Sequence, residues 1–430
     1  MFKSIATLAA LWLASLPGAL VLVVALLRNA AFPNRYGASH RKETVLLTGG
    51  KMTKALQLAR LFKQEGYRVV LAETSKYRLT AHRFSRAVDE FVVIPSPADG
   101  ETIYTEGLLR AVKKAKATYF VPVASPVASV ADAKANEELS RHCRVIHWTQ
   151  EDVEILDNKF LFCKKAQEFG LKAPQVFNIT QRSQIEEFPF SDYVNPFILK
   201  SIPYDSVERL DMRTLPHEGL SERLDALTIS TQHPWVLQEF IRGEEFCTHG
   251  TVIDGKLTVY CCCKSSPFQV NYEHVEEPEI KQWVETFVEH FGGTGQMSFD
   301  FIKTPEGEVL PIECNPRTHS AITTFYEDPR VPTAYIRAGD ALLPPFENKP
   351  TYWFAHELWR LIDRPVDYFR EFKRNVTLGK DAVWDRHDPL PFFWLHAVHI
   401  PSLLLRSLRE GKRWVRIDFN IGKLVEPGGD

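Results

Sequence analysis

Hydrophobic residues recur with two different periods in the first third of the chain, and the two periods alternate. Short apolar runs bounded by glycine or polar residues are typical of buried strands, as in TVLLTGG (44–50), RVVLAE (68–73) and ATYFVPVAS (117–125). Two longer segments between these runs have the helical period, KALQLARLFKQEGY (54–67) and YTEGLLRAVKKAK (104–116). Such alternation predicts a parallel sheet whose ligands bind at the carboxyl ends of the strands.

We therefore expect a Rossmann-like α/β domain over residues 43–148 and an α+β domain over residues 149–345. The second region combines two helical patterns with several strands. The helices are DNKFLFCKKAQEFGL (157–171) and EIKQWVETFVEHFG (279–292), and the strands include FILKSI (197–202), GQMSFDFIKT (295–304) and GEVLPIECN (307–315). Residues 346–430 are rich in aromatic residues and proline and predict a helical C-terminal extension.

The N-terminus has a different character, because residues 4–27, SIATLAALWLASLPGALVLVVALL, carry no charge. An apolar helix of this length can cross a bilayer. Basic residues are more frequent after it than before it, which places the body of the protein in the cytoplasm by the positive-inside rule. We expect residues 1–42 to be a membrane-anchor segment and the protein to be membrane-associated. The alternative is a hydrophobic hairpin or helix that lies on the membrane or on the protein.

Residues 400–416 combine leucines with four basic residues and predict a basic amphipathic helix. Such a helix either lies on a membrane surface or docks on the protein with its basic face in water, and the pattern does not choose between them.

Composition narrows the classes of function. A chain of 430 residues with 44% hydrophobic content can form two or three packed units, and its net charge of −2 gives no prediction of nucleic-acid binding. Seven cysteines, three of them consecutive at 261–263, lack the spacing of a zinc site or a disulfide framework. We expect them to be buried thiols.

The segment GEVLPIECNPRTHSAIT (307–323) places Glu313, Asn315 and Arg317 at alternate positions where an apolar run ends. Alternate residues of a strand share one face. Asp300 lies on the preceding predicted strand, so a hairpin would bring its carboxylate beside Glu313 and Asn315. Oxygen ligands of this kind suit Mg²⁺, with Mn²⁺ as an alternative. Taken singly, each residue is more often a solvated strand position.

Three further features suit a nucleotide. Lys159 starts a predicted helix and Lys200 ends a predicted strand, and either ammonium group could neutralise phosphate charge. QEFIRGEEF (238–246) has the pattern of a strand that turns, with backbone groups that could bind a planar base. His319 could assist an incoming amine or cap a turn.

Together, Lys159, Lys200, QEFIRGEEF, Asp300 and ECNPR (313–317) resemble, in order and spacing, the ATP-grasp superfamily. The resemblance covers residues 44–345 and includes the Rossmann-like domain that precedes the nucleotide site. It implies a role for each residue of the pattern: Lys159 and Lys200 on the ATP phosphates, Gln238 with the backbone of Glu239 and Ile241 on adenine, Glu245 on ribose, Asp300, Glu313 and Asn315 on Mg²⁺, and Arg317 with Lys200 in catalysis. One departure is the segment KSIPYDSVERLDM (200–212), which has no glycine where the family has a glycine-rich loop. Side chains are the expected substitutes there, namely Ser201, Tyr204, Asp205, Ser206 and Arg209.

A narrower group, the cyanobacterial ligases that form mycosporine-glycine, is similar over nearly the whole chain. The shared segments are GGKMTKALQLAR, HRFS, PVASPVAS, PYDS, ECNPRTHSAIT and IDFNIGKLVE. This resemblance implies that ATP phosphorylates 4-deoxygadusol, which then couples to glycine with release of ADP and phosphate. Two alternatives stay open: an ATP-grasp ligase that joins another carboxylate and amine, and a membrane-tethered nucleotide-binding protein without turnover. The oligomeric state also stays open, with a homodimer among the alternatives. For the acceptor we expect contacts from Lys51, His82, Arg83 and Ser125.

Overall fold

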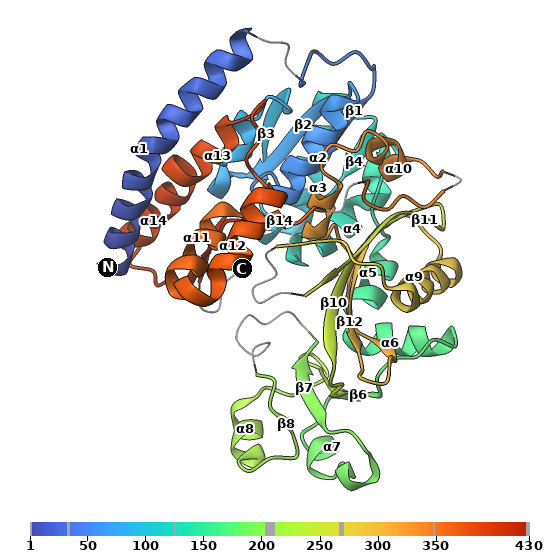
Figure 1. Cartoon of the computed structure of the whole chain (residues 1–430). Helices are drawn as coiled ribbons and strands as arrows, with labels where there is room; N and C mark the ends of the chain where they lie inside the picture. The colour runs from blue at the N-terminus through green and yellow to red at the C-terminus, as the bar shows by residue number, and fades with distance from the viewer. Residues whose placement is uncertain are drawn as a thin grey trace.

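The computed structural model describes residues 2–31, 35–123, 126–202, 211–265, 271–339, 341–346 and 349–426. Figure 1 shows a larger upper part, which contains the N-terminal sheet and the C-terminal helices, and a smaller lower lobe around β7 and β8.

The first sheet is parallel throughout and has the strand order β3-β2-β1-β4-β5. Its strands are β1 (Thr44–Leu47), β2 (Arg68–Thr74), β3 (Glu90–Ile94), β4 (Tyr119–Val121) and β5 (Arg144–Val145), with helices α2 (Thr53–Gln64), α3 (Glu101–Ala115) and α4 (Pro126–Ser140). The predicted Rossmann-like domain is therefore confirmed. Gly49 follows β1 with φ +67°, and a Cβ there would lie 1.8 Å from the carbonyl oxygen of Val123. Only glycine fits where β1 and β4 end side by side.

The lower lobe is built on an antiparallel sheet with the strand order β6-β9-β7-β8. Its elements are β6 (Val176–Ile179), β7 (Phe197–Ser201), β8 (Thr214–Leu215) and β9 (Trp235–Glu239), with α7 (Ser183–Glu186) and α8 (Leu220–Ala226). Aromatic rings fill this lobe, and Phe197 lies near the rings of Phe177, Phe188 and Tyr193. The lobe thus has an apolar core of its own.

A second antiparallel sheet, with the order β11-β10-β12-β13, connects the lobe to the upper part. It contains β10 (Glu244–Ile253), β11 (Lys256–Lys264), β12 (Gly295–Lys303) and β13 (Val309–Asn315), and α5 (Gln150–Asp157), α6 (Lys159–Glu168) and α9 (Pro278–Phe291) belong to the same region. Phe299 and Phe301 of β12 pack against Trp283 of α9. Asp300 between them therefore faces the other side of the sheet. The seven cysteines are free thiols, and all except the half-buried Cys143 are buried, as expected.

The C-terminal extension packs on the first domain. The short helix α10 (Val331–Ile336) precedes it. Its own elements are β14 (Thr351–Tyr352), α11 (Phe354–Asp363), α12 (Pro365–Leu378), β15 (Lys380–Asp381), α13 (Leu390–Trp394), the π-helix η8 (Leu395–His399), α14 (Ile400–Arg409), β16 (Arg416–Asp418) and β17 (Lys423–Val425). A buried ion pair between Arg60 of α2 and Asp388, 3.0 Å apart, joins the two parts. Removing one partner of such a pair would leave a buried charge uncompensated. The boundaries at 42/43, 148/149 and 345/346 stay predictions.

The helix predicted over residues 400–416 is shorter than expected. α14 ends at Arg409, Gly411 follows with φ +63°, and β16 starts at Arg416. The left-handed conformation at Gly411 ends the helix. Glycine suits this position because residues with a Cβ rarely adopt that conformation. Ile400, Leu403 and Leu404 are buried, so α14 is docked on the protein.

The predicted N-terminal apolar helix is present as α1 (Phe2–Ala31). Among the described residues, it is the one helix that is long and apolar enough to cross a membrane. It lies along the side of the molecule next to α14 (Figure 1).

A buried acid between α3 and α4 provides a test of the packing in the first domain. Asp132 is fully buried, and its Oδ1 accepts a hydrogen bond from the Tyr104 hydroxyl at 2.8 Å. Burial raises the pKa of Asp132 to about 7. As the pH rises from the ordinary Asp value toward 7, the unfolded chain ionises first, so the wild type loses stability across this window. Relative to Asp132→Asn, its free energy of unfolding should fall by about 3 kcal/mol between about pH 4.5 and about pH 7.5.

Urea unfolding at several pH values measures this difference. Glu137→Gln on the same helix, where the Glu137 side chain is 87% exposed, should leave the pH dependence unchanged. A constant difference between Asp132→Asn and the wild type would show that Asp132 ionises normally in the folded protein.

Candidate functional site

Two carboxylates face each other on the β12–β13 hairpin. Asp300 is directly opposite Glu313 in the register, and Ser298 is opposite Asn315. The Asn315 Nδ2 lies 3.5 Å from Asp300 Oδ2 and 3.3 Å from Glu313 Oε1. The hairpin predicted from the sequence is therefore present, and it brings the three predicted metal ligands together. Their role as ligands stays a prediction.

The electrostatics of this pair are unequal. Asp300 is buried, and burial followed by the charge of Glu313 raises its pKa well above the ordinary value. Burial also acts to raise the pKa of Glu313, but the ammonium groups of Lys159 and Lys200 outweigh it and lower that pKa to about 2. A like-charged pair in a partly desolvated site is unfavourable unless a proton or nearby positive charge compensates it.

Lys159 is positioned by a helix cap. It is the first residue of α6, and the preceding Asn158 accepts hydrogen bonds at its Oδ1 from the amides of Phe160 (3.0 Å) and Leu161 (3.2 Å). This capping fixes where the helix begins. The Lys159 Nζ lies 3.7 Å from Glu313 Oε2, so the lysine points toward the carboxylate pair. A phosphate placed between them would contact the same ammonium group.

Lys200 reaches the site from the lower lobe. Its Nζ donates to Gln238 Oε1 at 2.9 Å, and Gln238 Nε2 donates to the carbonyl oxygen of Ile312 at 3.0 Å. Burial lowers the pKa of Lys200, and Glu313 acts against this. Gln238 is only 1% exposed, so its side chain connects β7 and β9 to β13 and holds Lys200 in place. The predicted contact of Gln238 with adenine stays a prediction.

The other predicted nucleotide contacts lie where the chain passes from one sheet to the other. Glu239 is the half-buried last residue of β9, Ile241 lies in the connection, and Glu245 is exposed near the start of β10. Gly243 is required in this connection because a Cβ there would lie 2.1 Å from the carbonyl oxygen of Lys303. The connection therefore runs against the end of β12 and leads from β9 to β10 beside the carboxylates.

Arg317 lies on the opposite side of Asn315 from the carboxylates. Its guanidinium donates to Asn315 Oδ1 and lies 3.4 Å from Asp157 Oδ1. Asn315 thus has Nδ2 toward the carboxylates and Oδ1 toward Arg317, and a rotation of the amide would present its oxygen to a cation.

His319 caps the helix that follows it. Its Nδ1 accepts a hydrogen bond from the amide of Ala321 at 3.2 Å at the start of η7 (Ser320–Phe325). Burial, with the charges of Lys54 and Arg317, lowers the pKa of His319 to about 3, so the ring is neutral at neutral pH. Of the two roles expected for this residue, the geometry favours the structural one.

Lys54 is part of the site but was not predicted. It lies in the first turn of α2, is buried, and donates from Nζ to the carbonyl oxygen of Thr318 at 2.6 Å. Burial, with the charges of Arg317 and Lys51, lowers its pKa to about 7. A lysine in the first turn of the helix that follows β1 was the available sequence signal.

The four residues expected at the acceptor differ in position. His82 is fully buried and its Nδ1 lies 2.9 Å from the carbonyl oxygen of Gly50, which indicates a structural role. The Lys51 ammonium lies 4.1 Å from the centre of the Tyr77 ring, and Arg83 stacks on Phe91. Ser125 lies outside the described residues, as do Tyr204, Asp205, Ser206 and Arg209 of the glycine-free loop.

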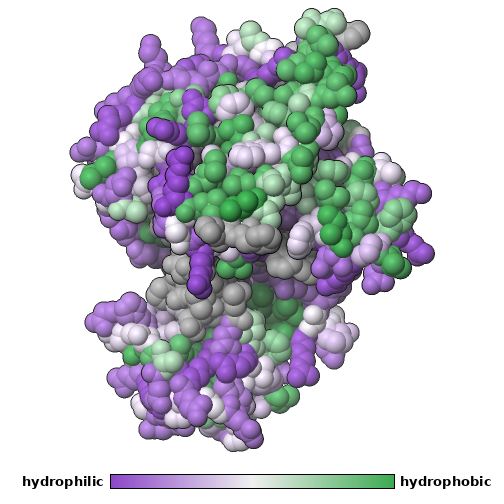
Figure 2. All heavy atoms as spheres, turned by 90° about the vertical axis from the view of Figure 1, so that its left-hand side faces the viewer, coloured by the Kyte–Doolittle hydropathy of each residue, from purple (hydrophilic) through white to green (hydrophobic). Residues whose placement is uncertain are grey.

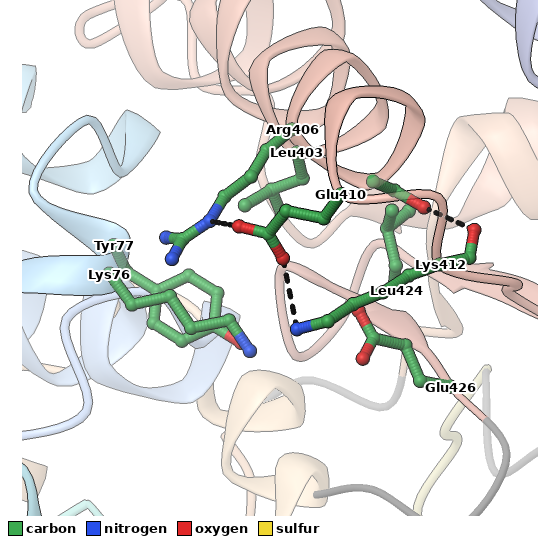
Figure 3. Close-up of a pocket in the computed structure, with 9 residues that line it drawn as sticks. Lys76, Tyr77, Leu403, Arg406, Glu410, Lys412, Leu424 and Glu426 are labelled. Atoms are coloured by element: carbon green, nitrogen blue, oxygen red, sulfur yellow. Dashed lines mark hydrogen bonds and ion pairs between the residues drawn. The ribbon is translucent and has the colours of Figure 1, made fainter.

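A pocket of about 120 Å³ lies elsewhere, between η1 (Ser75–Tyr77) and the C-terminal extension. Figure 3 shows that Glu410 pairs with both Arg406 and Lys412, at 2.7 and 2.9 Å. None of the residues predicted to bind nucleotide or metal lines this pocket. Its charges largely compensate one another.

The donor set suits a hard cation. Within the described part of the chain, no group of three or more His, Cys, Asp or Glu side chains is arranged for a metal ion. The Asp300–Glu313–Asn315 cluster instead supplies two carboxylates and an amide. Mg²⁺ is commonly held by one or two carboxylates together with phosphate oxygens. The residues present therefore fit Mg²⁺ when a nucleotide supplies the other ligands.

No family model matches this chain, and no curated protein matches it. Solved structures do match. One is N5-carboxyaminoimidazole ribonucleotide synthetase in an ADP complex (TM-score 0.55, 14% identity, 77% of this chain and 87% of that chain). Another is a complex of biotin carboxylase from Campylobacter jejuni with βγ-ATP (0.54, 14%, 69% and 72%). A third is the biotin carboxylase domain of Hydrogenobacter thermophilus 2-oxoglutarate carboxylase with MgADP and bicarbonate (0.50, 13%, 65% and 65%). The predicted ATP-grasp fold is confirmed.

Replacing Glu313 tests the carboxylate pair. In Glu313→Gln the amide keeps the shape of the side chain but removes the charge that faces Lys159 and Lys200. We expect Mg²⁺-dependent ADP formation to fall by at least about 100-fold, because charge compensation at transferring phosphates contributes several kcal/mol. The thermal unfolding midpoint should change little, since the hairpin pairing is retained.

Glu308→Gln is the matched control, because Glu308 precedes β13 in the same hairpin and its side chain is 51% exposed. It should keep the wild-type rate. Wild-type turnover in Glu313→Gln would remove Glu313 from the metal site.

Proposed function

We propose that the chain is an ATP-dependent ligase that forms a C–N bond, with Mg²⁺ bound at Asp300, Glu313 and Asn315. The observation that carries this proposal is the arrangement of the site. Two lysines from different elements, Lys159 and Lys200, point at a carboxylate pair located between two antiparallel sheets. A nucleoside triphosphate is a ligand that needs both signs of charge at once, ammonium groups for its oxygens and carboxylates for its metal ion.

The similar structures support the nucleotide part of the proposal. Three of them are named as complexes with ADP, βγ-ATP or MgADP. Because their sequence identities with this chain are 13–14%, they are evidence for the fold alone. The proposed chemistry is argued from the residues at the site.

The substrates we propose are 4-deoxygadusol and glycine. This assignment rests on the segments shared with the ligases that form mycosporine-glycine, two of which, GGKMTKALQLAR and ECNPRTHSAIT, meet in the structure. Lys54 comes from the first and donates to Thr318 of the second. The contact lies near the carboxyl ends of the parallel strands, where ligands of α/β domains bind. Arg317, together with Lys54 when it is protonated, places positive charge there, which suits an enolate oxygen as the acceptor.

In the first step, the enolic oxygen of the acceptor, which has lost its proton to solvent, attacks the γ-phosphorus of ATP, an O–P bond forms, and the bond to the bridging oxygen breaks to release ADP. Lys159 and Lys200 bind the phosphate oxygens and hold them in line. When bound, Mg²⁺ neutralises charge on the β- and γ-phosphates. Arg317, held by Asn315 and Asp157, stabilises the charge on the transferred phosphoryl group.

In the second step, the neutral amine of glycine attacks the carbon that bears the phosphorylated oxygen. A C–N bond forms, the C–O bond breaks, phosphate leaves with the electron pair, and the nitrogen loses its proton to solvent. His319 is not the base in this scheme, because its Nδ1 is occupied by the Ala321 amide. The chain's contribution is to hold the leaving phosphate with cationic side chains.

The full-length protein incubated with ATP, Mg²⁺, 4-deoxygadusol and glycine tests the proposal, with ADP measured enzymatically and products by mass spectrometry. We expect ADP and an ultraviolet-absorbing glycine adduct in equal amounts, and neither in Glu313→Gln. Formation of ADP only with another acceptor, such as a carboxylic acid, would replace the substrates but keep the ligase. Tight ATP binding without turnover on any acceptor would overturn the proposal that this is an enzyme.

A further inference from the structure

Both ends of α1 are tied to the body of the protein. At its start, the Ser4 hydroxyl accepts a hydrogen bond from Trp414 Nε1 at 2.9 Å, and the Lys3 ammonium lies 3.9 Å from the centre of the Trp414 ring. At its end, the Asn29 side chain donates to the carbonyl oxygen of Arg386 at 2.9 Å. The whole helix therefore lies along the protein.

One face of α1 is packed between these ends. Leu8 and Ala25 are buried, Leu11 packs against the core of the upper part, and Gly18 approaches the ring of Phe393. Together with Ser4 and Asn29 these positions are spaced by three, four or seven residues, so they form one stripe of the helix. A helix that crossed a bilayer would have to leave these contacts or draw α13 and α14 into the membrane with it.

The opposite face of α1 is apolar and exposed. Its residues are Leu13, Leu16, Leu20, Val23, Val24 and Leu27, each at least 51% exposed. A second exposed apolar group lies at the junction of α11 and α12, and its residues are Trp359, Ile362, Val366 and Phe369, each at least 58% exposed. Figure 2 shows hydrophobic side chains gathered along α1 and in a second area beside it, on one side of the molecule. Monomeric soluble proteins rarely expose apolar area on this scale.

Basic side chains flank the exposed stripe at both ends. Lys3 donates to the carbonyl oxygen of Val415 at 2.7 Å, which places the exposed Arg413 close to the start of the helix. Arg28 and Arg386 are exposed at the other end, where Asn29 contacts Arg386. Two copies of the chain joined through this face would bring like charges together whether the helices were parallel or antiparallel. An anionic lipid surface is complementary to the apolar stripe and to its ends.

We propose that α1 does not span the membrane but lies in the plane of an anionic bilayer surface, such as the cytoplasmic leaflet, with the α11–α12 junction as a second point of insertion. The apolar faces of both would enter the boundary between headgroups and acyl chains, while the basic residues contact lipid phosphates. The helix would remain packed on α13 and α14. This inference is independent of the reaction proposed above.

Flotation of the full-length protein with phosphatidylcholine vesicles, with and without phosphatidylserine, tests the second insertion point. The double variant Ile362→Glu/Val366→Glu changes two exposed residues and should keep the fold, which ATP binding and thermal unfolding will check. We expect recovery of the wild type with phosphatidylserine vesicles, and at least about a fivefold loss in the double variant. Val194→Glu, at a fully exposed apolar residue of the lower lobe, is the matched control and should float like the wild type.

Equal flotation of the double variant and the wild type would overturn the proposal, because a spanning α1 would not need α12. A protease-protection experiment gives a second test. Protease is added outside vesicles that carry the catalytic body on their outer face, and protection of an N-terminal epitope would overturn the proposal. Sedimentation velocity without vesicles tests whether a second copy of the chain binds this surface instead. A wild-type dimer that the double variant abolishes would assign the face to a second copy of the chain.

Discussion

The site depends on one electrostatic constraint, the placement of two carboxylates opposite each other on neighbouring strands. Asp300 and Glu313 pair across β12 and β13, and the resulting like-charge repulsion in a partly desolvated setting requires positive charge nearby. Lys159 and Lys200 meet that requirement within the chain. A bound metal ion and its nucleotide would meet it better, because the cation would bind the carboxylates and free the lysines for phosphate. The carboxylates and lysines of the site thus suit a ligand that carries both a cation and anionic phosphates.

The way in which the two lysines are held explains why the site needs two sheets. Lys159 is attached to the second sheet through α6, whereas Lys200 belongs to the lower lobe and reaches the carboxylates through Gln238. Gln238 bonds to the backbone of β13, so a small movement of the lobe would change the position of Lys200 relative to Glu313. Gly243 lets the connecting segment pass close to β12. The position of Lys200 relative to Glu313 is therefore set by a few hydrogen bonds between the lobe and β13.

The C-terminal extension joins α1 to the first domain. The extension is joined to the first domain by the buried Arg60–Asp388 pair, and α1 packs on the extension. This arrangement gives the molecule an apolar side, which differs in polarity from the charged site where the lysines and carboxylates meet. An enzyme held to a surface in this way would keep its nucleotide site in the aqueous phase.

The sequence by itself determined the type and order of most elements, because apolar periods, turns and glycine positions are local properties. It also determined that Asp300, Glu313 and Asn315 share one face, since the alternation of a hairpin leaves little freedom. Only the tertiary structure decided that Lys54 approaches Thr318, that Gln238 supports a lysine, and that the basic segment after Ile400 is docked. These outcomes depend on contacts between residues up to hundreds of positions apart. The same is true of α1: its composition allows it to cross a membrane, and its packing against α13 and α14 decides which face remains exposed.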